Sequence, residues 1–268
     1  MADVVTERVV YQSENGAVGA YLAKPAEGAP WPAVLVAHDR QGVWEHMEDT
    51  ANRLAQQSYL AVLPDMFWRD PVRQSLNIDD MLATSSILNG PDFEEALKQF
   101  PAEKHAAMRR AADWFNGPRP TTAAADFSAG IGYLKSRPDV RPDAVALLGY
   151  CMGGSRVAET VGGGADVAAA VIYYGSFSKP EEQAARVRCP VQGHYGLLDK
   201  GITGRVPATQ EAMRAAGKDY TPYTYEDAPH AFANFLSGSH RPEAARLSWE
   251  RTTEFLQRHL KGVPAGAR

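Results

Sequence analysis

The stretch Leu147-Leu148-Gly149-Tyr150-Cys151-Met152-Gly153-Gly154 decides how the rest of the chain is interpreted. An apolar run over residues 144–148 ends at Gly149, Cys151 follows two residues later, and two more glycines come next. This spacing is typical of a nucleophile held on a sharp turn between a strand and a helix. The neighbours of such a nucleophile must lack a Cβ atom that would clash there, and Gly149 and Gly153 meet that requirement. The stretch therefore predicts a strand, a strained turn carrying Cys151, and a helix directly after it.

Cys151 on its own admits two interpretations. A free cysteine is more often an inert small core residue than a nucleophile. As a nucleophile it would gain from the helix that follows, because a helix N-terminus favours negative charge and the thiolate is the reactive form. The choice depends on whether an acid and a histidine follow further along the chain, in that order.

The composition is that of an ordinary globular protein. The chain has 268 residues, of which 44% are hydrophobic and 22% charged, and the formal net charge is -4. We expect residues 1–268 to form one α/β domain, because folds of this class reach this size as single domains. The acidic balance and the absence of a basic block argue against a nucleic-acid partner. No stretch approaches the roughly 18 consecutive apolar residues of a membrane helix, so no membrane association is expected.

Cysteine usage and the first residues bear on the compartment. Cys151 and Cys189 are the only cysteines, which is too few for a disulfide framework and fits a reducing, cytoplasmic setting. The first eight residues lack a basic region followed by an apolar core, so no secretory signal is expected. No cysteine or histidine pair has the spacing of metal ligands, and we predict no metal site.

Apolar runs alternate with helical patterns along the chain. Residues 4–11 and 17–23 flank the turn sequence Ser13-Glu14-Asn15-Gly16 and predict an antiparallel hairpin at a sheet edge. Further strands are expected at residues 33–37, 59–63, 144–148, 167–174, 189–195 and 220–225. Helices are expected at residues 45–57, 121–136, 154–161, 206–216 and 241–260. The alternation predicts an α/β fold with a mostly parallel central sheet and helices on both faces.

Residues 66–120, which we call the excursion, interrupt this alternation. The segment carries three possible helices, at residues 79–88, 93–100 and 102–115, separated by prolines. A long insertion between a strand and a helix often becomes a lid or a substrate-facing excursion. The alternative is a surface embellishment with no role in binding.

Two further residues complete a catalytic constellation with Cys151. In the predicted order, Asp199 follows a later strand and His230 lies in the loop after the last strand, so all three lie at carboxyl ends of strands, where open α/β sheets bind ligands. The sequence of nucleophile, acid and histidine is that of α/β-hydrolases. His230 would act as general base and acid, and Asp199 would orient its ring. This agreement favours the nucleophile interpretation of Cys151.

The remaining histidines fit structural interpretations. His194 lies within a predicted strand and is expected to be a packed or hydrogen-bonded imidazole. His46, His105, His240 and His259 lie on predicted helices or loops and are expected at the surface.

Several motifs together resemble the dienelactone hydrolase family. They are the cysteine turn at residues 149–154, Tyr173-Tyr174-Gly175, Asp199 following Tyr195-Gly196, and Pro229-His230-Ala231-Phe232. The hairpin, the His38-Asp39-x-x-Gly42 loop and Leu63-Pro64-Asp65 match as well, so the resemblance covers about residues 5–260 except the excursion. It implies an α/β-hydrolase fold, a Cys-Asp-His triad, no cofactor, and hydrolysis of an ester or enol-lactone through a thioester intermediate.

The resemblance also implies a role for three residues beside the triad. The backbone N–H groups of Met152 and Arg40 would form the oxyanion hole, which stabilises the charge developing in the transition state. A family glutamate that helps to form the thiolate falls at Asp39, whose side chain is one methylene shorter. Asp39 is thus the candidate nucleophile-assisting acid, with its contact to Cys151 left open.

The expected substrate contacts are Tyr174, Asn234 and Trp114. The family holds a substrate carboxylate with arginine, and the position four residues beyond the histidine is Asn234 here. Arg109 and Arg110 lie in the excursion and are expected to belong to a solvated helix face. The aromatic residues Trp44, Phe67, Trp68 and Trp114 would either line an apolar acyl pocket or lie in the core.

The sequence thus predicts a cysteine-dependent hydrolase of a small-molecule ester or enol-lactone. One alternative is a general carboxylesterase or thioesterase without lactone preference, which the loss of arginine at Asn234 supports. Others are a non-catalytic member that binds a small ligand and a redox role for Cys151. The substrate and the oligomeric state stay open.

Overall fold

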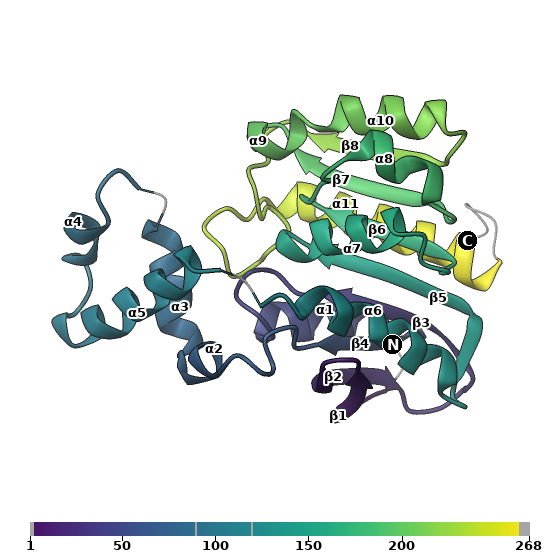
Figure 1. Cartoon of the computed structure of the whole chain (residues 1–268), viewed down its shortest axis with the longest axis horizontal. Coiled ribbons are helices and arrows are strands. Elements are labelled where there is room, and N and C mark those ends of the chain that lie inside the picture. Colours follow the sequence, from purple (N-terminus) through teal and green to yellow (C-terminus); the bar gives the residue numbers. More distant parts are fainter. Residues whose placement is uncertain (1–2, 89, 119, 263–268) are drawn as a thin grey trace.

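The computed structural model describes residues 3–88, 90–118 and 120–262, and one eight-stranded sheet runs through its centre (Figure 1). The strands lie in the order β1-β2-β4-β3-β5-β6-β7-β8. Their bounds are β1 Val4–Ser13, β2 Gly16–Pro25, β3 Trp31–Ala37, β4 Leu60–Pro64, β5 Val140–Tyr150, β6 Ala169–Tyr173, β7 Val191–Gly196 and β8 Tyr220–Tyr225. The hairpin β1-β2 and the pair β2-β4 are antiparallel, and all pairs from β4 to β8 are parallel. The predicted sheet and its N-terminal hairpin are confirmed.

Helices cover both faces of the sheet. One face packs against α1 (Glu45–Gln56) and α11 (Pro242–Lys261). The other packs mainly against α6 (Ala123–Ser136), α7 (Met152–Gly162) and α10 (Val206–Ala215), with the short α8 (Pro180–Gln183) beside α10. A further short helix, α9 (Lys200–Thr203), follows β7. All seven residues of β3 are buried, as expected for a parallel strand covered on both sides.

The strand that leads to Cys151 is longer than the sequence predicted. It begins at Val140 rather than at residue 144, and Val140 pairs with Trp31 across a register shift. The polar residues Arg141 and Asp143 conceal this part of the strand from a search for apolar runs. Most other predicted elements differ from the structure by no more than two residues at each end.

The excursion projects from one end of the sheet (Figure 1). Its helices are α2 (Pro71–Ser75), α3 (Ile78–Ile87), α4 (Phe93–Leu97) and α5 (His105–Asn116), with a 3₁₀ turn at Ala102–Lys104. Asp70, Asn77 and Asp92 cap α2, α3 and α4 through their side-chain oxygens, which satisfies free N–H groups of the first turns. The excursion has a small hydrophobic cluster of its own, formed by Phe67, Leu76, Met81, Ala111, Trp114 and Phe115.

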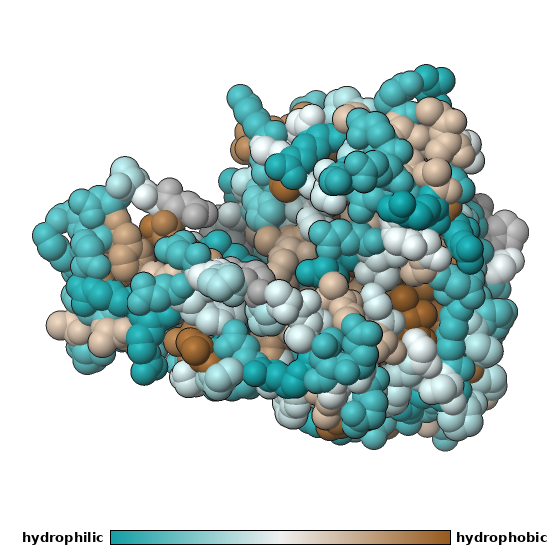
Figure 2. Space-filling view, in the orientation of Figure 1, coloured by the Kyte–Doolittle hydropathy of each residue, from teal (hydrophilic) through white to brown (hydrophobic). Residues whose placement is uncertain are grey.

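Hydrophilic residues cover most of the face seen in Figure 2, and hydrophobic residues appear there as small separate patches. No helix within the described ranges has both the length and the apolar character needed to cross a bilayer.

Candidate active site

Cys151 lies on the turn between β5 and α7 in a strained backbone conformation. Its φ is 57° and its ψ is -119°, a combination that residues with a side chain rarely adopt. A Cβ atom on Gly149 would lie 2.2 Å from the carbonyl oxygen of Gly153, and one on Gly153 would lie 2.2 Å from that of Ala37. The turn therefore requires glycine at both positions, which confirms the steric argument made from the sequence.

Cys151, His230 and Asp199 form one chain of hydrogen bonds. The Nε2 atom of His230 lies 3.0 Å from the Sγ atom of Cys151, and its Nδ1 atom lies 2.5 Å from Oδ2 of Asp199. Asp199 follows β7, and His230 belongs to the loop between β8 and α11. The three predicted residues thus come together from three segments distant in the sequence.

The His230 imidazole is held in conditions that favour its protonated form. Burial lowers the pKa of His230, but the hydrogen bonds to Asp199 and Cys151 raise it more, and the pKa is raised to about 10. An imidazolium beside the sulfur favours the thiolate, because opposite charges stabilise each other. The pair can therefore supply a nucleophile and a proton donor together.

Tyr174 lies beside this pair. Its ring centroid is 5.0 Å from that of His230, and the ring is fully enclosed by neighbours that include Phe232. Burial is the main cause that raises the pKa of Tyr174 well above 10, and nearby charge on Tyr150, Cys151 and Asp39 adds to the effect. Tyr174 is thus uncharged at neutral pH, and its aromatic ring lies beside His230.

Asp39 is buried and held by its own segment of the chain. Its Oδ1 atom accepts a hydrogen bond from the Gln41 N–H, and both carboxylate oxygens accept from Trp44 Nε1. Burial raises the pKa of Asp39 to about 7, although the hydrogen bonds from Gln41 and Trp44 lower it. Within the described ranges the carboxylate makes no hydrogen bond to Cys151. Trp44, one of the aromatic residues considered for an acyl pocket, is thus the partner of this acid.

The two backbone donors predicted for an oxyanion hole belong to the loop after β3 and to the start of α7. Met152 is the first residue of α7, and the first N–H groups of a helix have no acceptor within it. Arg40 follows Asp39, and the N–H groups of Gln41 and Gly42 donate to Asp39 itself. The Arg40 side chain leaves the loop and reaches Ser85 in α3.

The other expected substrate contacts have structural partners. Asn234 is buried, and its Oδ1 atom accepts a hydrogen bond from the Leu236 N–H at 3.0 Å. Trp114 donates from Nε1 to Asp70 at 2.7 Å. Arg109 is exposed and pairs with Glu94, as expected for a solvated helix face.

The remaining aromatic candidates Phe67 and Trp68 and the second arginine, Arg110, all belong to the excursion. Phe67 is buried in the cluster of the excursion, whereas Trp68 is 45% exposed and lies against Gly19 of β2. Arg110 is exposed on α5.

The prediction for His46 was wrong. Only 3% of its surface is exposed, and its ring lies between the rings of Trp44, Tyr150 and Phe235. Tyr150 and Phe235 come from segments far from His46 in the sequence, so helical position alone gave no sign of burial. His194 matches its prediction, because it is buried and hydrogen-bonded to Tyr225 and Gln192.

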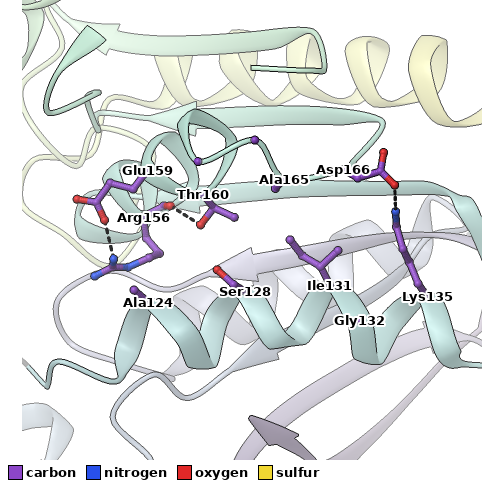
Figure 3. A pocket seen from close by; sticks show the side chains of 12 residues that line it. Ala124, Ser128, Ile131, Gly132, Lys135, Arg156, Glu159, Thr160, Ala165 and Asp166 are labelled. Carbon is purple, nitrogen blue, oxygen red and sulfur yellow. Dashed lines mark hydrogen bonds and ion pairs between the residues drawn. The ribbon is translucent and has the colours of Figure 1, made fainter. Parts of the chain in front are cut away.

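Two hollows lie away from the hydrogen-bonded cluster of Cys151, His230 and Asp199. A groove of about 570 Å³ runs between α6 and α7, flanked by the ion pairs Arg156–Glu159 and Lys135–Asp166 (Figure 3). A pocket of about 300 Å³ is lined by His46, Tyr150, Phe235 and Trp249, among others. Neither is lined by Cys151, Asp199 or His230, so the hydrogen-bonded cluster rather than cavity size identifies the candidate site.

Three contacts near the site were not foreseen from the sequence. They are the Asp39–Trp44 hydrogen bonds, the Arg40–Ser85 hydrogen bond and the contact of Arg73 with the Gln41 carbonyl. A tryptophan five residues after an acid was a weak local signal for the first. The other two join segments more than 30 residues apart, for which a single sequence carries no signal.

Comparison with known proteins supplies the family context. The family model described as dienelactone hydrolase family matches residues 18–260. Carboxymethylenebutenolidase from Pseudomonas putida is 30% identical over 259 residues, which cover 94% of this chain and 97% of that protein. Carboxymethylenebutenolidase from Pseudomonas sp. (strain P51) is 30% identical over 245 residues, covering 91% of each chain.

Solved structures agree with the fold. A putative dienelactone hydrolase from Klebsiella pneumoniae subsp. pneumoniae matches with a TM-score of 0.73 and 24% identity, over 95% of this chain and 98% of that one. A dienelactone hydrolase from Anabaena variabilis matches with a TM-score of 0.64 and 14% identity, over 96% of this chain and 99% of that one. The fold is therefore that of the α/β-hydrolases, as predicted.

Proposed function

Because the chain belongs to the dienelactone hydrolase family and is a hydrolase of ester or lactone bonds, we propose that Cys151 is its nucleophile. The supporting observation is the hydrogen-bonded chain from Cys151 Sγ through His230 to Asp199. A nucleophile, a base within hydrogen-bond reach and a third group that orients the base are the parts that covalent catalysis needs.

The proposed reaction has two steps. The Cys151 thiolate attacks the carbonyl carbon of the substrate, the S–C bond forms, and the C–O bond to the leaving group breaks. His230 gives its Nε2 proton to the leaving alkoxide or enolate. A water molecule then transfers a proton to His230 and attacks the thioester, which releases the acid and restores the thiolate. Asp199 holds the ring in position and stabilises the imidazolium.

The Met152 and Arg40 N–H groups are the proposed oxyanion hole. Met152 directly follows the strained turn as the first residue of α7, and Arg40 lies in the loop after β3, where the Ala37 and His38 carbonyls approach Gly153. Donors fixed in advance at the place where negative charge develops provide a few kcal/mol of transition-state stabilisation.

Asp39 is proposed to take up the thiol proton when Cys151 is protonated. A carboxyl group whose pKa is raised to about 7 is suited to exchange a proton near neutral pH. Trp44 and Gln41 hold the carboxylate in the resting arrangement, so this role requires the side chain to turn toward the sulfur.

The proposed substrate is a small-molecule ester or enol-lactone, with Tyr174 as a wall of the acyl site. A second candidate function is a general carboxylesterase or thioesterase without lactone preference. The observation that favours it is Asn234, which is uncharged and whose Oδ1 atom is engaged by the Leu236 N–H. The enclosed aromatic ring of Tyr174 suits an apolar acyl group equally well.

Turnover of p-nitrophenyl acetate, p-nitrophenyl butyrate and a dienelactone would test both candidates. We expect Cys151→Ala to lose activity on every substrate that the wild type hydrolyses, and Cys189→Ala to keep it. Activity on the lactone would support the family reaction, and activity on the simple esters alone would support the esterase. A Cys151→Ala enzyme as active as the wild type would refute the proposed nucleophile.

A further inference from the structure

The loop after β3 is tied to the excursion by side chains. We call residues 38–42 the oxyanion loop, because Arg40 is a proposed donor of the oxyanion hole. The Arg40 Nη2 atom donates to Ser85 Oγ at 2.5 Å, and Gln41 Nε2 donates to the same oxygen at 3.2 Å. Ser85 lies on α3, so one hydroxyl group of the excursion holds two consecutive side chains of the loop.

A second arginine holds the backbone of the same loop. The Nε and Nη2 atoms of Arg73, on α2, donate to the Gln41 carbonyl oxygen at 2.9 and 2.6 Å. Gly42 has a φ of 96°, and a Cβ atom there would lie 3.0 Å from Arg73 Nη2. The guanidinium therefore packs directly on the loop, which leaves the peptide planes around Gln41 little freedom to rotate.

The excursion also contacts the other proposed donor. The Met152 side chain packs against the small cluster of the excursion, which includes Phe67 and Phe115. The Arg40 guanidinium lies 4.7 Å from the centre of the Phe115 ring. The side chains of both proposed oxyanion donors thus contact the excursion, although their N–H groups belong to α7 and to the loop after β3.

We infer that the excursion sets the geometry of the oxyanion hole, with Ser85 as a positioning residue for Arg40. The inference rests on the proposed function, since it assumes that the Arg40 N–H receives the oxyanion. The direction of that N–H depends on the backbone angles of the loop, which the Arg40–Ser85 and Arg73–Gln41 hydrogen bonds restrain. Displacement of a catalytic group by about 1 Å is enough to slow a reaction up to about 100-fold.

Two reactions of the same thiol separate this role from a general structural one. Acylation of Cys151 by p-nitrophenyl acetate develops negative charge on a carbonyl oxygen and uses the oxyanion hole. Alkylation by iodoacetamide displaces iodide at a saturated carbon and develops no such charge. Loss of oxyanion geometry alone slows the first reaction and leaves the second unchanged.

The test compares Ser85→Ala with Ser85→Thr and with Ser86→Ala. Ser86 is the matched control, because it lies next to Ser85 but is exposed and bonds within its own helix. We expect Ser85→Ala to slow acylation about 10-fold, through kcat rather than KM, with unchanged alkylation. Ser85→Thr keeps the hydroxyl group and should restore acylation, and Ser86→Ala should match the wild type.

Arg40→Met gives an independent check, since it keeps the backbone N–H and removes the anchor. It should slow acylation to a similar extent, and the double variant with Ser85→Ala should be no slower than Ser85→Ala alone.

Wild-type acylation in Ser85→Ala would overturn the inference, as would parallel losses of acylation and alkylation. If iodoacetamide left the wild-type turnover intact, the proposed nucleophile would fail instead.

Discussion

The indole nitrogen of Trp44 lies 3.2 Å from each oxygen of the Asp39 carboxylate. The acid is only 6% exposed, and it is kept in place by this contact and by the Gln41 N–H. Because burial opposes the charged form, the pKa of Asp39 is raised from 3.8 to about 7. The residue proposed to assist the nucleophile is therefore also a source of pH-dependent stability.

Asp39→Asn should change how stability depends on pH. The folded protein holds a proton on Asp39 that the unfolded chain releases between pH 3.8 and about 7. Its contribution to the free energy of unfolding is therefore present at low pH and lost as pH rises through this window. Between pH 4 and pH 8, the free energy of unfolding of Asp39→Asn should rise by about 2–4 kcal/mol relative to that of the wild type. Urea unfolding at both values measures the difference, and two parallel curves would contradict the expectation.

His46→Leu should reduce the sensitivity of the fold to acid. Burial lowers the pKa of His46 from 6.5 to about 3, with Arg53 and His240 adding to the effect. The unfolded chain thus binds a proton that the folded protein excludes, and stability falls as pH decreases from 6.5 toward 3. Between pH 6.5 and pH 3, the free energy of unfolding of the variant should fall by a few kcal/mol less than that of the wild type.

His194, whose pKa burial also lowers to about 3, supplies a part of the dependence that remains in the variant. Both ring nitrogens of His46 lack a hydrogen-bond partner in the described structure, so leucine removes no hydrogen bond between described residues. Unfolding at pH 4 and pH 7 gives the measurement, and an unchanged slope would count against the burial of His46.

Gly149→Ala should destabilise the protein strongly. The new Cβ atom would lie 2.2 Å from the Gly153 carbonyl oxygen, so β5 and α7 would have to separate. We expect a loss of about 3 kcal/mol or more. Gly132→Ala on α6 is the matched control, because nothing lies within 4 Å of its Cβ position. The free energy of unfolding of the control should rise by about 0.5–1 kcal/mol, because alanine has the higher helix propensity. Equal effects of the two changes would contradict this prediction.

Native alkylation should distinguish the two thiols. Cys151 is half-buried beside His230, whereas Cys189 is 6% exposed and burial raises its pKa to about 12. Because the thiolate is the reactive form, iodoacetamide should label the folded protein once, at Cys151. Mass spectrometry should find a second label only after denaturation, and preferential labelling of Cys189 would be incompatible with this assignment.

Much of the fold could be predicted because its signals are local. The buried strands β3, β4 and β6 appear as apolar runs, and Cys151, Asp199 and His230 follow the ends of three strands in a known order. The glycines around Cys151 indicated that backbone segments approach each other there too closely to leave room for a Cβ atom. The chain order of these features is sufficient to infer which side chains meet at one edge of the sheet.

What could not be predicted depends on contacts between distant segments. His46 has the helical position of a surface residue, and it is buried by Tyr150 and Phe235. Trp114 donates a hydrogen bond to Asp70, which lies 44 residues earlier in the chain. The start of β5 was missed because Arg141, Pro142 and Asp143 interrupt the apolar pattern and are only partly buried or exposed.

The separate cluster of the excursion has a consequence for how the protein loses activity on heating. Phe67, Trp114 and Phe115 pack among excursion residues, whereas Ile78 and Leu82 of α3 pack against one of the large cores, so opening of α2–α5 would expose only a small part of that core. Such a sub-global opening requires less free energy than unfolding of the whole chain, and its amides should exchange with solvent before those of β3 and β5. If the oxyanion loop depends on α2 and α3, inactivation would begin at a lower temperature than melting of the sheet.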